Sequence, residues 1–89
     1  MKYRSRTEIM GMILECARSG ITKTKIMYKV YLSHAQVKEY IALLQDNELL
    51  SYEEGTQLYR LSEKGYKFLQ SYGEISELIA LMPNTTLNF

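Results

Sequence analysis

The chain has 89 residues, of which 46% are hydrophobic and 24% charged, a composition that excludes a disordered polypeptide and fits one compact domain. Its single cysteine, Cys16, and single histidine, His34, exclude a disulfide framework and a zinc site built within the chain. The longest apolar stretches are far shorter than the ~20 residues of a membrane span, and no apolar signal core follows the basic N-terminal residues. We therefore expect a cytoplasmic protein.

Charge is distributed unevenly, although the net charge of the chain is only +1. Residues 1–45 contain eight lysines and arginines against three acidic side chains, whereas residues 46–89 contain three against seven. This asymmetry indicates either a basic face suited to phosphate groups or an ordinary solvated surface of mixed charge.

The first predicted helix covers residues 6–19. Ser5 and Glu8 have the spacing of a capping box, and apolar residues recur behind them at helical intervals. Cys16 falls on that apolar stripe, so we interpret it as a small buried hydrophobe rather than a redox or metal residue. Gly20 stands where a glycine commonly ends a helix.

Two further short helices are predicted next. Thr22 or Thr24 can cap the second helix, which ends near Val30. After a brief connection, Ser33 is a suitable N-cap for a third helix that ends near residues 46–47. The apolar stripe of this third helix consists of Val37, Tyr40, Ile41 and Leu44.

The pattern then changes from helical to extended. Residues 48–53 and 57–61 are short runs rich in leucine and tyrosine, and Gly55 lies in the connection between them, which predicts a β-hairpin. Three short helices followed by a hairpin is the order of a winged helix-turn-helix. The predicted fold class is therefore mainly α with a small β-hairpin.

The rest of the chain predicts one more helix, which Pro83 ends. Its apolar residues repeat at spacings of three and four, as in a heptad seam. We therefore predict a winged helix-turn-helix domain at residues 1–61, a C-terminal dimerisation helix at 62–82 and a flexible tail at 83–89.

The seam of this last helix predicts a homodimer. Beyond Gly73 the apolar residues extend past a three-helix core and need a second chain to cover them. The alternative, for the residues before Gly73, is packing on the first helix of the same chain. The predicted dimer contacts are Phe68, Tyr72, Ile75, Leu78, Ile79 and Met82.

The third helix carries the predicted contact with double-stranded DNA. The side opposite its apolar stripe presents small or polar residues that fit a major groove, where glutamine and lysine contact base edges. Basic residues in and before the first two helices are placed to contact phosphates. The predicted DNA-binding residues are Ser33, His34, Ala35, Gln36, Lys38, Lys23, Lys25, Lys29, Arg4 and Arg6.

Acidic residues oppose part of this prediction. Glu39 and Asp46 share the exposed side of the third helix, where phosphates repel them, and Glu53 and Glu54 flank the hairpin turn. We therefore expect the hairpin tip to make little contact with a duplex. A merely solvated face is the alternative for the third helix and for each single lysine.

Several runs of residues resemble one known family. They are Glu8-Ile9, Ile13 to Cys16, Ser19-Gly20, Lys23 to Tyr28, Leu32-Ser33, Tyr40-Ile41, and Leu61 with Glu63 to Gly65. Together they look like the small archaeal winged-helix DNA-binding proteins. That resemblance implies a homodimer, joined by an antiparallel coiled coil of C-terminal helices, that binds duplex DNA with limited sequence preference or regulates transcription. The shorter C-terminal helix and the acidic wing depart from the family pattern.

The sequence thus predicts a dimeric DNA-binding protein, either a transcriptional regulator or a nucleoid-associated protein of the chromatin type. The alternative is a winged-helix module that binds another protein and no DNA. We expect neither an enzyme nor a cofactor, because the sequence contains no nucleophile with a base, no carboxylate pair and no phosphate-binding loop. No membrane partner is expected either.

Overall fold

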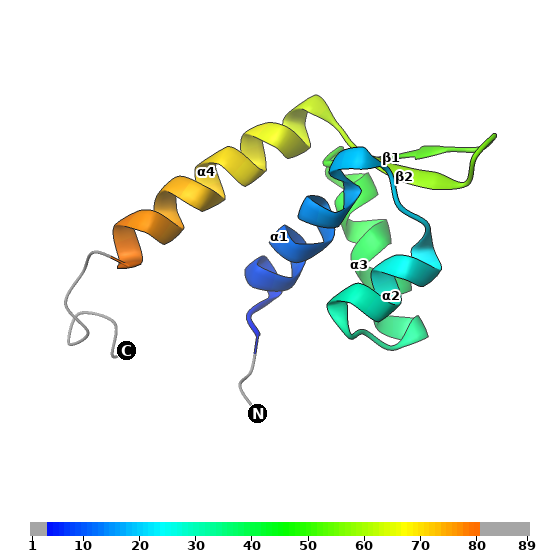
Figure 1. The fold of residues 1–89 in the computed structure, drawn as a ribbon, viewed down its shortest axis with the longest axis horizontal. Helices are drawn as coiled ribbons and strands as arrows, with labels where there is room; N and C mark the ends of the chain where they lie inside the picture. Colours follow the sequence, from blue (N-terminus) through cyan, green and yellow to red (C-terminus); the bar gives the residue numbers. More distant parts are fainter. Residues whose placement is uncertain (1–3, 81–89) are drawn as a thin grey trace.

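The computed structural model describes residues 4–80 of the chain. Its elements are α1 (Arg6–Cys16), the short 3-10 helix η1 (Ala17–Ser19), α2 (Lys23–Val30), α3 (His34–Asp46), β1 (Leu50–Glu53), β2 (Leu58–Leu61) and α4 (Glu63–Ala80). Figure 1 shows α1, α2 and α3 gathered together, the hairpin projecting from one end, and α4 running away from the hairpin on the α1 side. The predicted mainly helical fold with a small antiparallel hairpin is confirmed.

Side chains cap the first two long helices at predicted residues. Ser5 and Glu8 form the capping box of α1, in which Ser5 Oγ accepts a hydrogen bond from Glu8 N at 3.0 Å. At the start of α2, Thr22 rather than Thr24 is the cap, and its hydroxyl oxygen accepts from Lys25 N at 3.3 Å. These local bonds satisfy N–H groups that have no partner inside a helix.

The first helix ends in a tightened turn. The helix predicted for residues 6–19 is α-helical to Cys16, and its last three residues form η1. Gly20 follows with φ +90°, a conformation that side chains disfavour. A Cβ at Gly20 would lie 3.1 Å from Arg60 Nη1 and 3.2 Å from Leu58 Cδ1, so β2 packs directly against this glycine.

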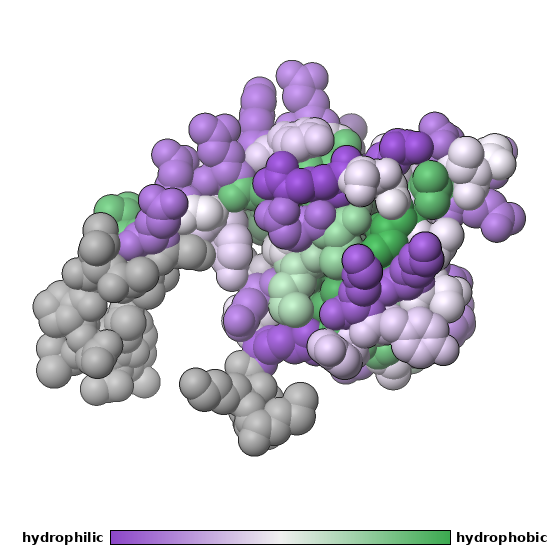
Figure 2. Space-filling model, in the orientation of Figure 1, coloured by the Kyte–Doolittle hydropathy of each residue, from purple (hydrophilic) through white to green (hydrophobic). Residues whose placement is uncertain are grey.

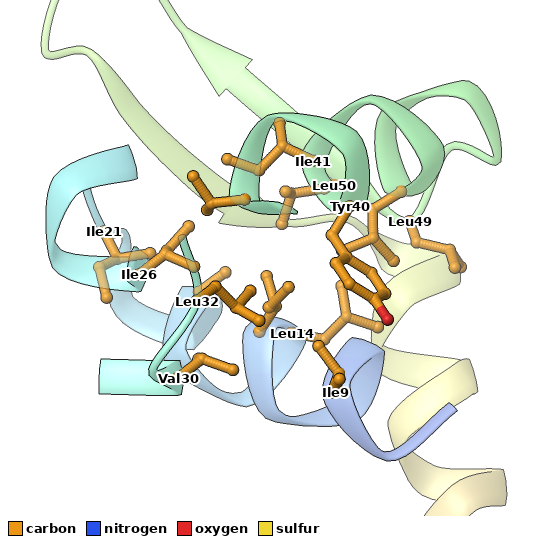
Figure 3. Close-up of a cluster of buried hydrophobic side chains, with 14 of the residues drawn as sticks. Ile9, Leu14, Ile21, Ile26, Val30, Leu32, Tyr40, Ile41, Leu49 and Leu50 are labelled. Atoms are coloured by element: carbon orange, nitrogen blue, oxygen red, sulfur yellow. The ribbon is translucent and has the colours of Figure 1, made fainter. Parts of the chain in front are cut away.

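One hydrophobic core joins all the helices to the hairpin. Figure 3 shows side chains of α1, α2 and α3 pointing toward a common centre, together with Leu49 and Leu50 at the start of the hairpin. The predicted apolar stripe of α3 lies inside this core, and each of its four side chains is at most 6% exposed. The opposite side of α3 therefore faces solvent. The buried residues are Ile9, Ile13, Leu14, Ala17, Ile21, Ile26, Val30, Leu32, Val37, Tyr40, Ile41, Leu44, Leu49, Leu50 and Leu69.

The hairpin is antiparallel, with Leu50 opposite Leu61 and Glu53 opposite Leu58. Its first strand starts later than the predicted run 48–53, because Glu48 adopts φ +60° in the turn after α3. Ile21 pairs with Tyr59 through two backbone hydrogen bonds of 3.0 and 2.8 Å. This bridge fixes the hairpin beside the segment that leads into α2.

The first half of α4 packs on its own domain. A Cβ at Gly65 would lie 2.3 Å from the backbone oxygen of Leu49, so only glycine allows α4 to start this close to the core. Leu69 is buried, and the ring of Tyr72 covers Gly11, where a Cβ would lie 3.3 Å from Tyr72 Cε2. Gly65 therefore lets α4 start against Leu49, and Gly11 lets the Tyr72 ring lie close against α1.

The second half of α4 leaves the core. The side chains of Ile75 and Leu78 are 55% and 60% exposed, and Figure 2 shows apolar surface at this distal end. The side chain of Ile79 and all of residues 81–89 lie outside the described part of the chain, so Met82 and the predicted tail at 83–89 stay sequence predictions. Within residues 4–80, no helix is both long and apolar enough to cross a membrane.

Candidate nucleic-acid interface

The outer face of α3 is open to solvent along its length. His34, Ala35, Lys38 and Ala42 are all exposed, as the predicted orientation of the helix requires. Lys38 belongs to none of the ion pairs that form within residues 4–80. Its ammonium group is therefore available to an external anion or base edge.

Ser33 and Gln36 are engaged with each other in a second capping box. Ser33 Oγ accepts from Gln36 N at 3.1 Å, and Gln36 Oε1 accepts from Ser33 N at 2.9 Å. The amide NH₂ of Gln36 and the hydroxyl hydrogen of Ser33 remain as donors. Gln36 can therefore donate to an acceptor such as guanine or a phosphate. Adenine requires the glutamine oxygen as well, and that oxygen already accepts from Ser33 N.

Arg6 contacts α3. Its Nη1 lies 3.9 Å from Glu39 Oε1, and its guanidinium carbon lies 5.3 Å from the centre of the Tyr40 ring. The negative charge of Glu39, which opposes phosphate binding at this face, therefore has a positive partner within the chain. The sequence predicted Arg6 as a phosphate contact and did not predict this pairing.

Arg4 contacts the C-terminal end of α2. Its Nη1 donates to the backbone oxygen of Val30, and its Nη2 donates to that of Tyr31 at 3.3 Å. Tyr31 is in the left-handed conformation with φ +57°, where a helix commonly ends. Arg4 thus satisfies carbonyl groups that α2 itself leaves without partners, a role that the sequence did not predict.

Three lysines lie on α2. Lys25 and Lys29 are exposed and one helical turn apart, and Lys23 is half-buried beside the hairpin. The ion pairs within the described residues include none of them. With Lys38 they make up the lysine group, the name we use for Lys23, Lys25, Lys29 and Lys38.

The hairpin tip uses its charges internally. Within residues 50–61, Arg60 is the only cation, and its Nη2 lies 3.5 Å from Glu53 Oε1. Thr56 Oγ1 also donates to Glu53. The Thr56 hydroxyl first, and then the Arg60 charge, lower the pKa of Glu53 below its ordinary value. The tip therefore offers little free positive charge.

A shallow hollow of about 300 Å³ lies between the first turn of α2 and the hairpin. The sequence did not predict it, because it depends on the bridge between Ile21 and Tyr59. Its lining residues are Thr22, Lys23, Thr24, Tyr52, Gln57 and Tyr59.

Cys16 is half-buried and packs against the core, and burial raises the pKa of its thiol above the ordinary value. The thiol therefore stays protonated at neutral pH. Within residues 4–80, no group of three or more histidine, cysteine, aspartate or glutamate side chains is placed to hold a metal ion.

Comparisons with known proteins agree with this geometry. A family model described as winged helix-turn-helix matches residues 3–80. Among solved structures, the fold is similar to that of ZitR from Lactococcus lactis, wild type in complex with DNA, with a TM-score of 0.53 and 27% sequence identity. The match covers 86% of this chain and 62% of the ZitR chain. None of the curated proteins matches the sequence.

Proposed function

Because the chain belongs to the winged helix-turn-helix family, we propose that it binds double-stranded DNA with α3 in the major groove. The observation that carries the proposal is the outer face of α3, which is exposed along its length and presents Lys38, a residue outside every ion pair formed within residues 4–80. The similarity to the ZitR structure, which is a complex with DNA, supports the same role.

The proposed base contacts are at the start of α3. Small Ala35 lets the helix approach the bases closely, while His34 and Lys38 reach toward them. Ser33 contributes its hydroxyl hydrogen and Gln36 its amide NH₂, the donors that their capping box does not use. The proposed set is Ser33, His34, Ala35, Gln36 and Lys38.

The proposed phosphate contacts are on α2 and before α1. Lys23, Lys25 and Lys29 act through charge alone, since they have no partner among the described ion pairs. Arg4 and Arg6 have partners within the chain, but a guanidinium has five donors and keeps some for a phosphate. Binding of this kind is strongly salt-dependent.

A titration of random duplex DNA at several salt concentrations, followed by fluorescence anisotropy, tests the proposal. If each chain neutralises about four phosphates, a dimer gives a slope of log affinity against log salt of about −7. Lys38→Gln should weaken binding, and Lys67→Gln on α4, which removes the same charge, should not. Absence of binding at low salt contradicts the proposal and favours a protein-binding module.

We also propose that α4 joins two chains. Ile75 and Leu78 expose apolar surface that a second copy would cover, together with Ile79 and Met82. Phe68 and Tyr72 have stacked rings with centres 6.4 Å apart and are only partly buried by their own chain, so we include their exposed parts at the inner end of the dimer contact. In this proposal residues 1–61 are the DNA-binding domain, and the dimerisation helix follows from residue 62.

Sedimentation velocity measures the dimer directly. Leu78→Glu places a charge in the exposed apolar surface and should give monomers, while Gln70→Glu, an exposed position on the half of α4 nearer the core, should leave the dimer intact. A wild-type chain that sediments as a monomer at all concentrations contradicts the dimer.

Two biological roles fit this proposal: a transcriptional regulator, or a nucleoid-associated protein of the chromatin type, as in the archaeal proteins that the sequence resembles. Both act in the cytoplasm. Competition between a selected DNA site and random DNA separates them, because a regulator binds its site about 10³-fold or more tightly than random sequence.

A further inference from the structure

A second hollow, of about 400 Å³, lies between α1 and α4, the two helices on the left of the domain in Figure 1, and we call it the α1–α4 hollow. Its apolar lining comes from both helices, with Gly11 and Met12 on α1 and Leu69, Tyr72 and Gly73 on α4. Small-molecule sites have volumes of about 300 to 1,000 Å³ and mostly apolar walls with a few polar groups. The α1–α4 hollow therefore has the size and the lining of such a site.

The charged residues that line this hollow are both acidic. Glu8 and Glu15 are seven residues apart on α1 and so share one side of that helix. Glu15 is already paired, because Arg18 donates to both of its carboxylate oxygens. Glu8 is outside every ion pair formed within residues 4–80, and its Oε1 accepts from Ser5 N at 3.3 Å. The hollow therefore has one carboxylate that no cation of the described residues neutralises.

The nearest cation to the lining is held elsewhere. Arg4 Nη1 lies 3.7 Å from Met12 Sδ, but Arg4 is not among the described lining residues. Its guanidinium donates to the backbone oxygens of Val30 and Tyr31 at the end of α2. Arg4 is thus fixed on α2 and leaves the Glu8 carboxylate free.

Gly73 leaves one edge of the hollow open. Glycine inside a helix costs about 1 kcal/mol relative to alanine. Among the described residues, no atom lies within 4 Å of a Cβ built at Gly73, so crowding within this part of the chain does not require a glycine there. The position is therefore explained by something that approaches α4 closely from outside the described residues.

The lining indicates what approaches. Aromatic rings such as that of Tyr72 attract cations, and carboxylates attract the same charge. The thioether of Met12 adapts to irregular apolar shapes. An organic anion would instead be repelled by Glu8, and a hydrated metal ion would leave the apolar walls without a partner.

We propose that the α1–α4 hollow binds a small organic cation with an apolar or aromatic body. The body lies against Met12, Leu69 and Tyr72, and the positive group lies beside the Glu8 carboxylate. This binding goes beyond the proposed function and does not depend on it, since neither α3 nor the lysine group lines the hollow.

A titration of the full chain with benzyltrimethylammonium chloride, without DNA, tests the proposal. Backbone amides are followed by NMR, and the signals of Gly11 and Gly73 report occupancy because both residues line the hollow. Both should shift in a saturable way. Phenylacetate, which places a carboxylate on a similar ring, should give no saturable shift at the same ionic strength. Absence of a saturable shift with the cation overturns the proposal.

Glu8→Gln tests the charge. Glutamine also completes a capping box, so the start of α1 should stay intact, and thermal unfolding checks this. Because the Glu8 carboxylate is exposed, its removal should weaken cation binding by only about fivefold. Glu54→Gln removes the same charge at the hairpin tip and should bind as the wild type does. Equal affinities in the two variants overturn the proposal.

Gly73→Leu tests the space. Since a Cβ at Gly73 meets open space and leucine favours a helix, the variant should fold at least as stably as the wild type, with cation binding lost. Ser71→Leu places the same side chain at an exposed position on the other side of α4 and should still bind the cation. Unchanged binding in Gly73→Leu, or equal loss in both variants, contradicts the proposal.

Sedimentation velocity identifies the alternative occupant, a second copy of the chain. If the wild type is a dimer that binds no cation, and Gly73→Leu is a monomer, the hollow is covered by the second copy and the proposal is overturned. A chain that binds the cation but no DNA leaves this proposal standing and removes the proposed function.

Discussion

The lysine group and the hairpin tip use their charges in opposite ways. In the lysine group, each ammonium group is absent from the ion pairs of the described residues. At the hairpin tip, Arg60 and Glu53 pair with each other. The comparison shows that a count of cations in a sequence does not measure the charge available to a ligand, because part of it is used within the fold.

The arginines extend this comparison to the whole described chain. Arg4 binds backbone oxygens, Arg6 lies near Glu39, Arg18 pairs with Glu15 and Arg60 pairs with Glu53. A guanidinium has several donors in a fixed plane and joins two elements well, whereas an ammonium is a strongly hydrated point charge. We infer that the arginines are engaged within the fold, whereas the lysines are the cations left for the ligand.

Charge reversal in the lysine group should have the largest effect. The double change Lys25→Glu and Lys29→Glu replaces two phosphate attractions with repulsions, so affinity for random duplex DNA at low salt should fall by about a hundredfold. The control is the pair Lys64→Glu and Lys67→Glu on α4. Equal losses of DNA affinity in the two double variants would mean that net charge alone decides binding.

Arg4→Gln should have the next largest effect, on stability rather than on charge. It leaves the last carbonyls of α2 without their charged donor, which should lower the free energy of unfolding by about 1–2 kcal/mol. Urea denaturation measures the change. Lys25→Gln should leave stability nearly unchanged, and a similar loss in both variants would remove the distinction between arginines and lysines.

Removal of the ion-pair partner of Arg60 should have a smaller effect, and it should raise DNA affinity rather than lower it. Glu53→Gln removes the partner of Arg60 and so adds a free cation to the hairpin, which should raise DNA affinity at low salt by about twofold to threefold. Glu54→Gln changes the net charge equally and leaves the pair intact. If both variants bind alike, the pairing at the tip is irrelevant to binding.

The pH dependence of stability should show the smallest effect. Because the folded pKa of Glu53 lies below its ordinary value of 4.5, its contribution is fully present above that value and is lost as the pH falls through the folded pKa. The stability difference between wild type and Glu53→Gln should therefore disappear in acid. A difference that stays constant from neutral pH to acid contradicts the assignment. Thermal melts across this range measure it.

Local features of the fold could be predicted from the sequence. The capping residues Ser5 and Ser33 act within three residues of themselves, and the stripe of α3 follows from helical spacing. The hairpin was predicted from its turn and its composition, although β1 is shorter than the run 48–53.

Contacts between distant residues could not be predicted. Arg4 meets Val30, and Arg6 meets Glu39, only because the core brings α1 against α2 and α3. The hollow between α2 and the hairpin likewise depends on a pairing between Ile21 and Tyr59. Such contacts leave no short-range pattern in the sequence. Two of the predicted DNA-binding residues, Arg4 and Arg6, therefore have partners within the chain that the sequence did not indicate.

Gly65 gives α4 a fixed starting point, because Leu49 leaves no room there for a Cβ. In a dimer joined by α4, the direction in which this helix leaves the domain sets the separation of the two copies of α3. That separation must match the distance between successive major grooves on one side of the duplex, about 34 Å or a multiple of it. A glycine without contact to DNA would thus determine the spacing of the half-sites that the protein can occupy together.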